Sequence, residues 1–342
     1  MSRRILVGPA AVCVVLACVG VGLALADGHT KRARHAPRAA QATPAMCGLT
    51  TTVPKYKHVI VIFFENHSYQ QIIGSPSAPT FNSVANTCGL ATNYHNISHP
   101  SLPEYLAATD GGTLHQVTTP FVSDCTPSAQ CESKSNNIFK QLSVRKRLWK
   151  GYNESMPSNC DRANVGFYAA RHNPAVYYTD LTDCASRDVA LGTTSSSPLL
   201  HDFSSENTAP AYAWVTPNLC DDMHNAAGCP GASNIVVTGD NWLKLWLPKL
   251  VSTKVYKAHD TVIFIGFDEG AGGTGGEACA TNTTDQSCRV PMIVVAPSVK
   301  HGKRVARLLN HYSLLKGSED LLGLPEWNQA TTAADMLKPF NL

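Results

Sequence analysis

The sequence has little net charge, no visible internal repeat and no cysteine pair at the spacing of a structural zinc site. Its formal charge is +3, and Arg3 and Arg4 supply two of those charges within a segment that we expect to be removed, so no basic face for nucleic acid is predicted. The absence of paired C-x-x-C spacing argues against structural zinc. The glycine-rich run 270–276 lacks the Gly-Lys-Ser/Thr ending of a phosphate loop and opens no obvious helix, which predicts a mobile loop.

The N-terminal segment is typical of an export signal. Residues 1–26 begin with a basic pair, continue through an apolar stretch and end in Ala24-Leu25-Ala26, which predicts a signal peptide cleaved before Asp27. Two alternatives stay open. The apolar stretch is long enough for a retained membrane anchor, and Cys18 follows a sequence that partly resembles a lipoprotein processing site. Membrane attachment through this segment is therefore the alternative to secretion.

The length and composition fit one large domain or two small ones, because the chain has 342 residues of which 44% are hydrophobic. We expect a flexible tether at residues 27–54, rich in Ala, Pro, Arg and His, followed by one domain at 55–342. Residues from about 110 to about 210 are rich in Ser, Asn, Gly and Cys and carry only short periodic pieces. This stretch predicts an insertion pinned by disulfides.

Ten cysteines remain after the two in the predicted signal, and an even number in an exported chain indicates disulfides. Ten cysteines allow many connectivities, and pairs that are close in sequence are the natural expectation. The expected pairs are Cys47 with Cys88, Cys125 with Cys131, Cys160 with Cys184, Cys220 with Cys229, and Cys279 with Cys288.

Two apolar runs end abruptly in acidic residues. The run 59–64 leads into Glu65-Asn66-His67, and the run 261–267 leads into Asp268-Glu269-Gly270. Short β-branched apolar runs predict strands buried on both faces, as in parallel α/β sheets, which bind ligands beyond the carboxyl ends of their strands. Acidic residues also begin ordinary polar loops, so either cluster alone is weak evidence for a cation site. Together they predict a site for a hard cation.

Further elements alternate along the chain in the manner of an α/β protein. We expect strands at 58–64, 90–97, 211–215, 261–267 and 292–296, and helices at 79–86, 101–109, 238–251 and 311–322. Ser101 begins the second of these helices, directly after His99-Pro100. A serine there is usually an N-cap, but a helix start also offers free N–H groups that bind phosphate and lower the cost of ionising a hydroxyl. Ser101 is therefore a candidate nucleophile.

Several motifs in fixed order resemble one family. They are Glu65-Asn66-His67-Ser68, Ser101-Leu102-Pro103 after His99-Pro100, Tyr168-Ala-Ala-Arg-His172-Asn-Pro174, Pro217-Asn218-Leu-Cys-Asp-Asp222-Met-His224, Phe267-Asp268-Glu269-Gly270, Arg289-Val-Pro291 and His311-Tyr-Ser-Leu-Leu. Together they cover nearly everything from about 56 to 325 and resemble the bacterial phosphoesterase family of acid phosphatases and phospholipases C, within the alkaline phosphatase superfamily.

The resemblance implies an α/β fold with a mainly parallel, doubly wound sheet flanked by helices. It also implies one divalent metal ion surrounded by Glu65, Asn66, Ser101, Asp268 and Glu269, with Ser101 taking up the phosphoryl group. A second metal site in the wider superfamily corresponds to Asp222, His224 and His311, although the spacing of the first two is shorter than the Asp-x-x-x-His of two-zinc relatives. Those three side chains can instead bind phosphate or donate a proton.

Proton delivery to the leaving group is a task for histidine. The candidates are His99, His115, His172, His224 and His311. We favour His172 because it lies in a polar loop sequence, where a role in core packing accounts for it poorly. The sequence thus predicts an exported, metal-dependent acid phosphatase that hydrolyses phosphomonoesters through a phosphoserine. The alternatives are a phospholipase C acting on lipid head groups and a surface binding protein without turnover. The lack of a conspicuous amphipathic docking helix favours the monoesterase.

Overall fold

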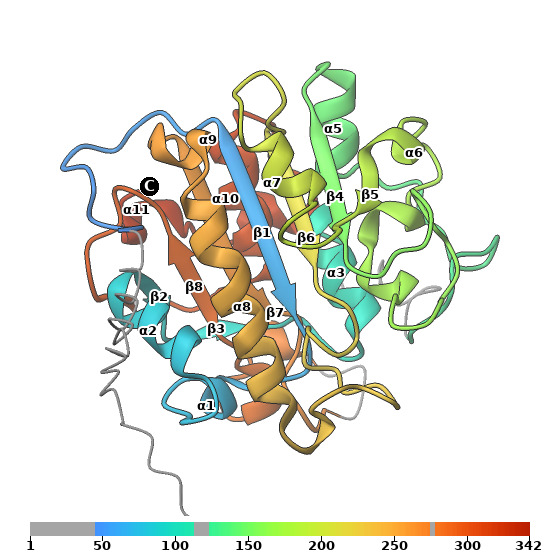
Figure 1. Ribbon diagram of the computed structural model, residues 1–342, viewed down its shortest axis with the longest axis horizontal. Helices are drawn as coiled ribbons and strands as arrows, with labels where there is room; N and C mark the ends of the chain where they lie inside the picture. The colour runs from blue at the N-terminus through green and yellow to red at the C-terminus, as the bar shows by residue number, and fades with distance from the viewer. Residues whose placement is uncertain (1–44, 113–122, 274–277) are drawn as a thin grey trace, which may run out of the picture. The chain divides into compact units, whose positions relative to one another are not determined.

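The computed structural model describes residues 45–112, 123–273 and 278–342 (Figure 1). The predicted signal or anchor at 1–26, His115 and part of the glycine-rich run lie outside these residues. Within the described ranges, no helix combines the length and the apolar character that crossing a membrane requires.

The core of the fold is an eight-stranded sheet with the order β5-β4-β6-β1-β7-β8-β2-β9. Strand β8 runs antiparallel to β7 and β2, and the other pairs in this sheet are parallel. Two short strands form a second sheet. The strands are β1 (His58–Phe64), β2 (Gly89–Ala91), β3 (Tyr94–His95), β4 (Trp149–Asn153), β5 (Asp188–Ala190), β6 (Tyr212–Thr216), β7 (Thr261–Phe267), β8 (Met292–Val295), β9 (Lys303–Val305) and β10 (Leu309–Asn310).

Helices cover both faces of the sheet. Figure 1 shows α8 in front of the central strands, where it packs on α2, and α3 and α10 behind them, packed on each other. This arrangement confirms the doubly wound, mainly parallel α/β fold. The helices are α1 (Tyr69–Ile72), α2 (Pro79–Thr87), α3 (Ser101–Asp110), α5 (Ile138–Val144), α6 (Cys184–Arg187), α7 (Pro198–Asp202), α8 (Ile235–Val251), α9 (Lys254–Lys257), α10 (His311–Leu321) and α11 (Leu337–Phe340).

The central strands β1 and β7 are buried along their whole length, as their uninterrupted apolar runs predict. The predicted strand at 90–97 is divided instead. Its first part, β2, joins the main sheet, and its second part, β3, pairs with β10 in the small sheet. The side chain of Arg289 binds the carbonyl of Thr92 at the break, with Nε at 3.0 Å, and so holds the chain where it changes partners.

All ten cysteines from Cys47 to Cys288 form the five expected disulfides. The bond between Cys47 and Cys88 ties down residues that the sequence assigns to the tether. Met46 and Cys47 are buried, and the amide of Gly48 donates to the carbonyl of Val299 at 2.8 Å. The packed unit therefore begins N-terminal to residue 55.

The predicted insertion at 110–210 extends the sheet. It contributes α5, β4, α6, β5 and α7, and β4 pairs in parallel with β6. Two disulfides lie within it, joining Cys125 to Cys131 and Cys160 to Cys184. The segment thus places its loops, including residues 168–174, at the same sheet edge as the ends of β1 and β6.

Candidate active site

The two predicted acidic clusters meet at the carboxyl ends of neighbouring strands. Strands β1 and β7 pair in parallel with Phe64 opposite Phe267, so the residues that follow them are adjacent. The amide of Asp268 donates to the carbonyl of Phe64 at 2.9 Å, and the amide of Asn66 donates to Asp268 Oδ1 at 3.0 Å. The parallel register therefore brings together residues about 200 positions apart in the sequence.

Ser101 points its hydroxyl at this cluster. It is buried, and its Oγ lies 2.9 Å from Glu65 Oε2, 3.3 Å from Glu269 Oε1 and 3.5 Å from Asn66 Oδ1. Helix α3 begins at Ser101 with Pro100 as its N-cap residue, and no side chain at that position caps the helix. Ser101 therefore does not act as the N-cap of its helix, and its hydroxyl is directed at carboxylates.

The site concentrates buried carboxyl groups. Burial raises the pKa of Glu65, and the charges of Asp268 and Asp222 raise it further. Burial likewise raises the pKa of Asp268 to about 6, while burial and the charge of Asp268 raise that of Glu269. Burial is the largest cause of each shift, since a carboxylate loses hydration when it is buried. The cluster can stay ionised only beside compensating positive charge.

Two oxygens of this cluster lack hydrogen bonds among the described residues. Asp268 Oδ2 and Glu269 Oε2 are buried without a hydrogen-bond partner, although His99 Nε2 lies 3.6 Å from Glu269 Oε2. The donor set around Ser101 consists of carboxylate, amide and hydroxyl oxygens, which hard divalent cations prefer. The residues present therefore fit a divalent metal ion.

His172 lies between two carboxylates. Its Nδ1 is 3.1 Å from Asp222 Oδ2 and its Nε2 is 3.3 Å from Glu65 Oε1. The ring stacks on that of Tyr105 at 5.4 Å between centroids, and the Tyr105 hydroxyl donates to Glu65. Burial, with smaller contributions from Arg171 and His224, lowers the pKa of His172 below its ordinary value.

His224 lies at the outer side of this group and is only half-buried. Its amide donates to Asp222 Oδ1 at 2.7 Å, and its Nε2 accepts from Arg171 Nη2 at 2.9 Å. Burial lowers the pKa of His224 to about 4. Glu65, His172 and His224 each offer one ligand atom, and these atoms lie within 4.8 Å of one another, a second arrangement that can hold a metal ion.

His311 lies elsewhere, at the start of α10. Its Nε2 is 2.6 Å from the carbonyl of Asp268 and 3.2 Å from Glu104 Oε2, and its Nδ1 is 2.9 Å from the Tyr94 hydroxyl. The contacts of both ring nitrogens thus differ from those of Asp222 and His224. The structure brings Asp222 and His224 together with His172, whereas His311 supports the backbone that carries Asp268.

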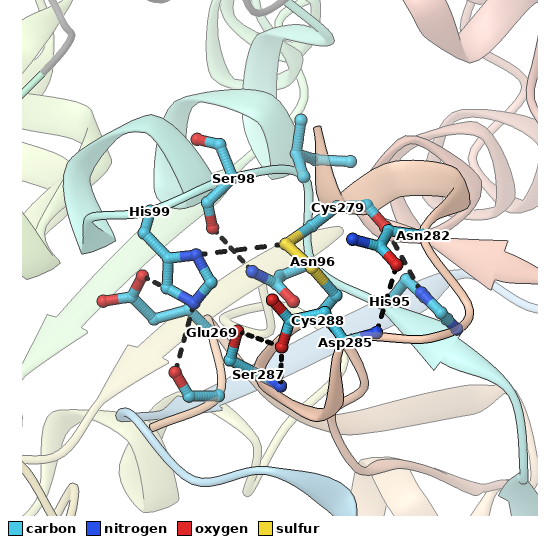
Figure 2. The surroundings of a disulfide bond; sticks show 12 residues. His95, Asn96, Ser98, His99, Glu269, Cys279, Asn282, Asp285, Ser287 and Cys288 are labelled. Carbon is cyan, nitrogen blue, oxygen red and sulfur yellow. Dashed lines mark hydrogen bonds and ion pairs between the residues drawn. A yellow bond between two sulfur atoms is a disulfide. The ribbon is translucent and has the colours of Figure 1, made fainter. Parts of the chain in front are cut away.

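A loop closed by the disulfide between Cys279 and Cys288 lies beside Asn96, Ser98 and His99, shortly before Ser101 in the sequence (Figure 2). Cys279 and Cys288 bracket it, with the Cys279 amide donating to the carbonyl of Ile97 at 2.8 Å and the Asn96 amide donating to the carbonyl of Cys288 at 3.1 Å. In the segment that contains Asn96 and Ile97, His99 Nε2 lies 3.2 Å from the carbonyl of Gly270. The loop thus connects the residues before Ser101 to the segment that carries Glu269.

Three residues of the site were not predicted from the sequence: Tyr105, Asp124 and Arg171. Tyr105 follows Ser101 by one helical turn, a spacing that places both on one face of α3. Arg171 precedes His172 and lies 3.1 Å from Asp124 through its Nε. Asp124 has no motif around it that indicates a role.

Comparisons with known proteins find relatives of this chain by sequence. A model of the Phosphoesterase family matches residues 75–325. The phosphatidylinositol-3-phosphatase of Mycobacterium tuberculosis is 25% identical and covers 85% of each chain. The phosphate-repressible acid phosphatase of Penicillium chrysogenum is 27% identical over 73% of this chain, which spans only 55% of that relative.

Solved structures share the fold. A member of the alkaline phosphatase superfamily from Vibrio parahaemolyticus superposes with a TM-score of 0.55 at 12% identity, over 85% of this chain and 74% of that one. The lipoteichoic acid synthase of Listeria monocytogenes superposes with a TM-score of 0.54 at 12% identity, over 87% and 78%. At these identities the likeness concerns the fold alone.

Proposed function

The chain belongs to the Phosphoesterase family of hydrolases that act on phosphoric ester bonds, and from this premise we propose that it is an exported, metal-dependent acid phosphatase that works through a phosphoserine. The observation that carries the proposal is the position of Ser101, whose hydroxyl faces Glu65 and Glu269 while Pro100 occupies the N-cap position. A serine with only a structural role needs no carboxylates around it. The acid phosphatases among its relatives support the monoesterase.

In the proposed reaction, Ser101 attacks phosphorus in line with the leaving ester oxygen. Its hydroxyl loses a proton as its oxygen forms the new bond to phosphorus, the bond from phosphorus to the ester oxygen breaks, and the leaving alcohol takes up a proton, so the step conserves protons. Water then attacks the phosphoserine, and inorganic phosphate leaves as the Ser101 hydroxyl is restored. The start of α3 favours this chemistry because its dipole stabilises negative charge on the serine oxygen and on the phosphoryl group.

Glu65, Asn66, Ser101, Asp268 and Glu269 would hold the metal ion. When bound there, a divalent cation would compensate the buried carboxylates, lower the cost of ionising the serine hydroxyl and stabilise charge on the phosphoryl oxygens. The two carboxylate oxygens of Asp268 and Glu269 that lack hydrogen bonds support this assignment.

The candidates for proton delivery to the leaving group are His172, His224 and His311; the rings of His172 and His311 are buried, and His224 is half-exposed at the edge of the site. His172 and Asp222 either orient the side chains of this part of the site or complete a second metal or phosphate site with His224. His311 positions Asp268 through its backbone carbonyl.

Export is part of the proposal, since five disulfides suit an oxidising compartment. The substrate can be a soluble or a lipid-borne phosphomonoester, because one relative is a phosphatidylinositol-3-phosphatase. A phospholipase C would instead cleave the head group from a phospholipid and leave diacylglycerol.

The test uses purified protein with p-nitrophenyl phosphate and, separately, with phosphatidylcholine vesicles. The proposal expects release of p-nitrophenol and none by the Ser101→Ala form. Release of phosphocholine without p-nitrophenol would favour the phospholipase C, and no turnover of either substrate would favour a binding protein.

A further inference from the structure

Asp124 bridges two donors beside the nucleophile. Its Oδ1 accepts a hydrogen bond from the amide of Leu102 at 3.0 Å, and its Oδ2 lies 3.1 Å from Arg171 Nε. Leu102 directly follows Ser101 in the first turn of α3, so this amide points out of the helix start next to the proposed nucleophile. The carboxylate therefore occupies a position where a helix of this length binds anions.

Arg171 belongs to the site on its other side. Its Nη2 donates to His224 Nε2 at 2.9 Å, so the guanidinium lies between Asp124 and His224. Arg171 Nε is a buried atom, and its contact with Asp124 lacks the geometry of a hydrogen bond. One donor of the guanidinium thus faces an anion without being fully satisfied by it.

These contacts close a ring around the nucleophile. Starting from Ser101, the ring passes through Glu65, His172, Asp222, His224, Arg171 and Asp124 and returns to the amide of Leu102. Asp124 differs from the other acids of the ring, because 36% of its side chain is exposed whereas Glu65 and Asp222 are fully buried. It is the acid of this ring that can turn into solvent at low cost.

A phosphoryl group presents oxygens in the same way as a carboxylate. Guanidinium and backbone N–H groups bind both anions, and a dianionic phosphate binds them more strongly than a single carboxylate does. A phosphate ester that reaches Ser101 needs donors for its non-bridging oxygens. Leu102 and Arg171 offer such donors, and Asp124 occupies both.

We propose that Asp124 is an internal competitor of phosphate, which holds the Leu102 amide and the Arg171 guanidinium until the phosphoryl group of the substrate displaces it. The inference rests on the proposed function, because it assigns these donors to the substrate of the same site. It makes Arg171 a phosphate-binding residue and Asp124 a residue that weakens the binding of substrate and product. Asp124 thereby limits inhibition by the phosphate that the reaction releases.

A purely structural role of Asp124 predicts the opposite sign. If Asp124 served to hold Arg171 in place, its removal would weaken phosphate binding as removal of Arg171 does. The competitor account predicts that loss of Asp124 strengthens phosphate binding and that loss of Arg171 weakens it.

The experiment measures binding of inorganic phosphate by calorimetry, and inhibition of p-nitrophenyl phosphate hydrolysis by phosphate. It compares the wild type with Asp124→Ala, Asp124→Asn and Arg171→Ala. Glu132→Gln is the matched control, because it removes a half-buried carboxylate of the same segment that pairs with Arg162. Asp124→Ala should bind phosphate about tenfold more tightly, since a charge-assisted contact no longer competes, and Arg171→Ala about tenfold more weakly. Asp124→Asn should lie between the wild type and Asp124→Ala, and Glu132→Gln should equal the wild type.

Unchanged or weaker phosphate binding by Asp124→Ala, in a protein whose melting temperature matches that of Glu132→Gln, would overturn the inference. The failure of the proposed function looks different. If Asp124→Ala binds phosphate more tightly but no variant hydrolyses a phosphate ester, the proposed enzyme activity is wrong while the competition stands. If the wild type hydrolyses the ester and Asp124→Ala gains no affinity, only the competition is wrong.

Discussion

The hydroxyl of Ser101 donates to Glu65 Oε2 at 2.9 Å, although the two residues come from different elements and lie 36 positions apart. Glu65 follows the central strand β1, and Ser101 is the first residue of α3. A buried hydroxyl that faces buried carboxylates at the end of a parallel strand is the feature on which the proposed chemistry depends. The predictions below test this feature and the parts of the fold that hold it.

Glu65→Gln and Asp268→Asn should each lose bound metal and turnover together. Each change removes one negative charge from an oxygen cluster while it keeps the shape of the side chain, so the affinity for a divalent cation falls. Elemental analysis and p-nitrophenyl phosphate hydrolysis on the same preparations measure both quantities. Glu132→Gln is the control, because that carboxylate pairs with Arg162 and belongs to none of the side-chain groups that could hold a metal ion among the described residues.

Removal of the metal should abolish activity, and one of Mn, Zn, Fe, Ca or Mg should restore it. Full turnover in protein that elemental analysis finds free of metal would contradict the metal assignment. Normal metal content in either the Glu65 or the Asp268 variant would show that the residue concerned is not a ligand.

The disulfide between Cys279 and Cys288 should matter for turnover as well as stability. Replacing both cysteines with Ala costs about 2–5 kcal/mol, typical of a native disulfide, and also loosens the loop that binds Ile97 and Asn96 ahead of Ser101. The matched control removes Cys160 and Cys184, which lie in the segment around α6.

Both double variants should melt at lower temperature, and only the first should lose turnover at temperatures where it remains folded. Equal turnover in the two variants would mean that the loop does not position the site. Peptide mapping under non-reducing conditions should find all ten cysteines oxidised, and free thiols on most of them would refute the exported, oxidised protein.

Asp188 should make the protein more stable in acid. Its carboxylate accepts hydrogen bonds from Asn153 and Asn173 at 2.7 and 2.6 Å, and burial raises its pKa from the ordinary 3.8 to about 7. The folded protein therefore holds a proton that the unfolded chain releases. This contribution is fully present below about pH 4 and is lost as the pH rises through about 7.

Urea unfolding at several pH values between about 4 and about 7 measures this effect. The free energy of unfolding of the wild type should fall with rising pH, and Asp188→Asn should show a flatter dependence. Asp161→Asn is the control, because hydrogen bonds from Ser158 and Ala163 lower the pKa of that carboxyl, so its contribution to stability depends on pH with the opposite sign. An equally steep fall in Asp188→Asn would exclude Asp188 as the source.

The sequence was sufficient to predict the central strands of the fold and the acidic residues that follow two of them. Strands β1 and β7 are uninterrupted apolar runs, which burial on both faces explains, and the parallel register then fixes where Glu65 and Asp268 meet. The start of α3 was also predictable, because Pro103 fits only the first turn of a helix.

Other features depend on packing between distant segments. The division of 90–97 into β2 and β3 follows from pairing with β9 and β10, more than 200 residues later, which local periodicity does not encode. His311 and His224 are indistinguishable as ligand types in sequence, yet one faces the backbone of Asp268 and the other Arg171. No sequence motif surrounds Asp124, so only the tertiary structure reveals its contact with Leu102.

The most direct test of the account is whether Ser101 carries phosphate during turnover. A reaction with p-nitrophenyl phosphate that carries a label in its phosphoryl group is quenched rapidly with acid. Peptide mapping should then place the labelled phosphate on the peptide that contains Ser101. Ser101→Ala should keep its melting temperature, since Pro100 rather than Ser101 occupies the N-cap position, and should lose turnover by several orders of magnitude. Near-normal turnover by the Ala form, or no label on the Ser101 peptide of an active wild type, would contradict the account and indicate direct attack by water.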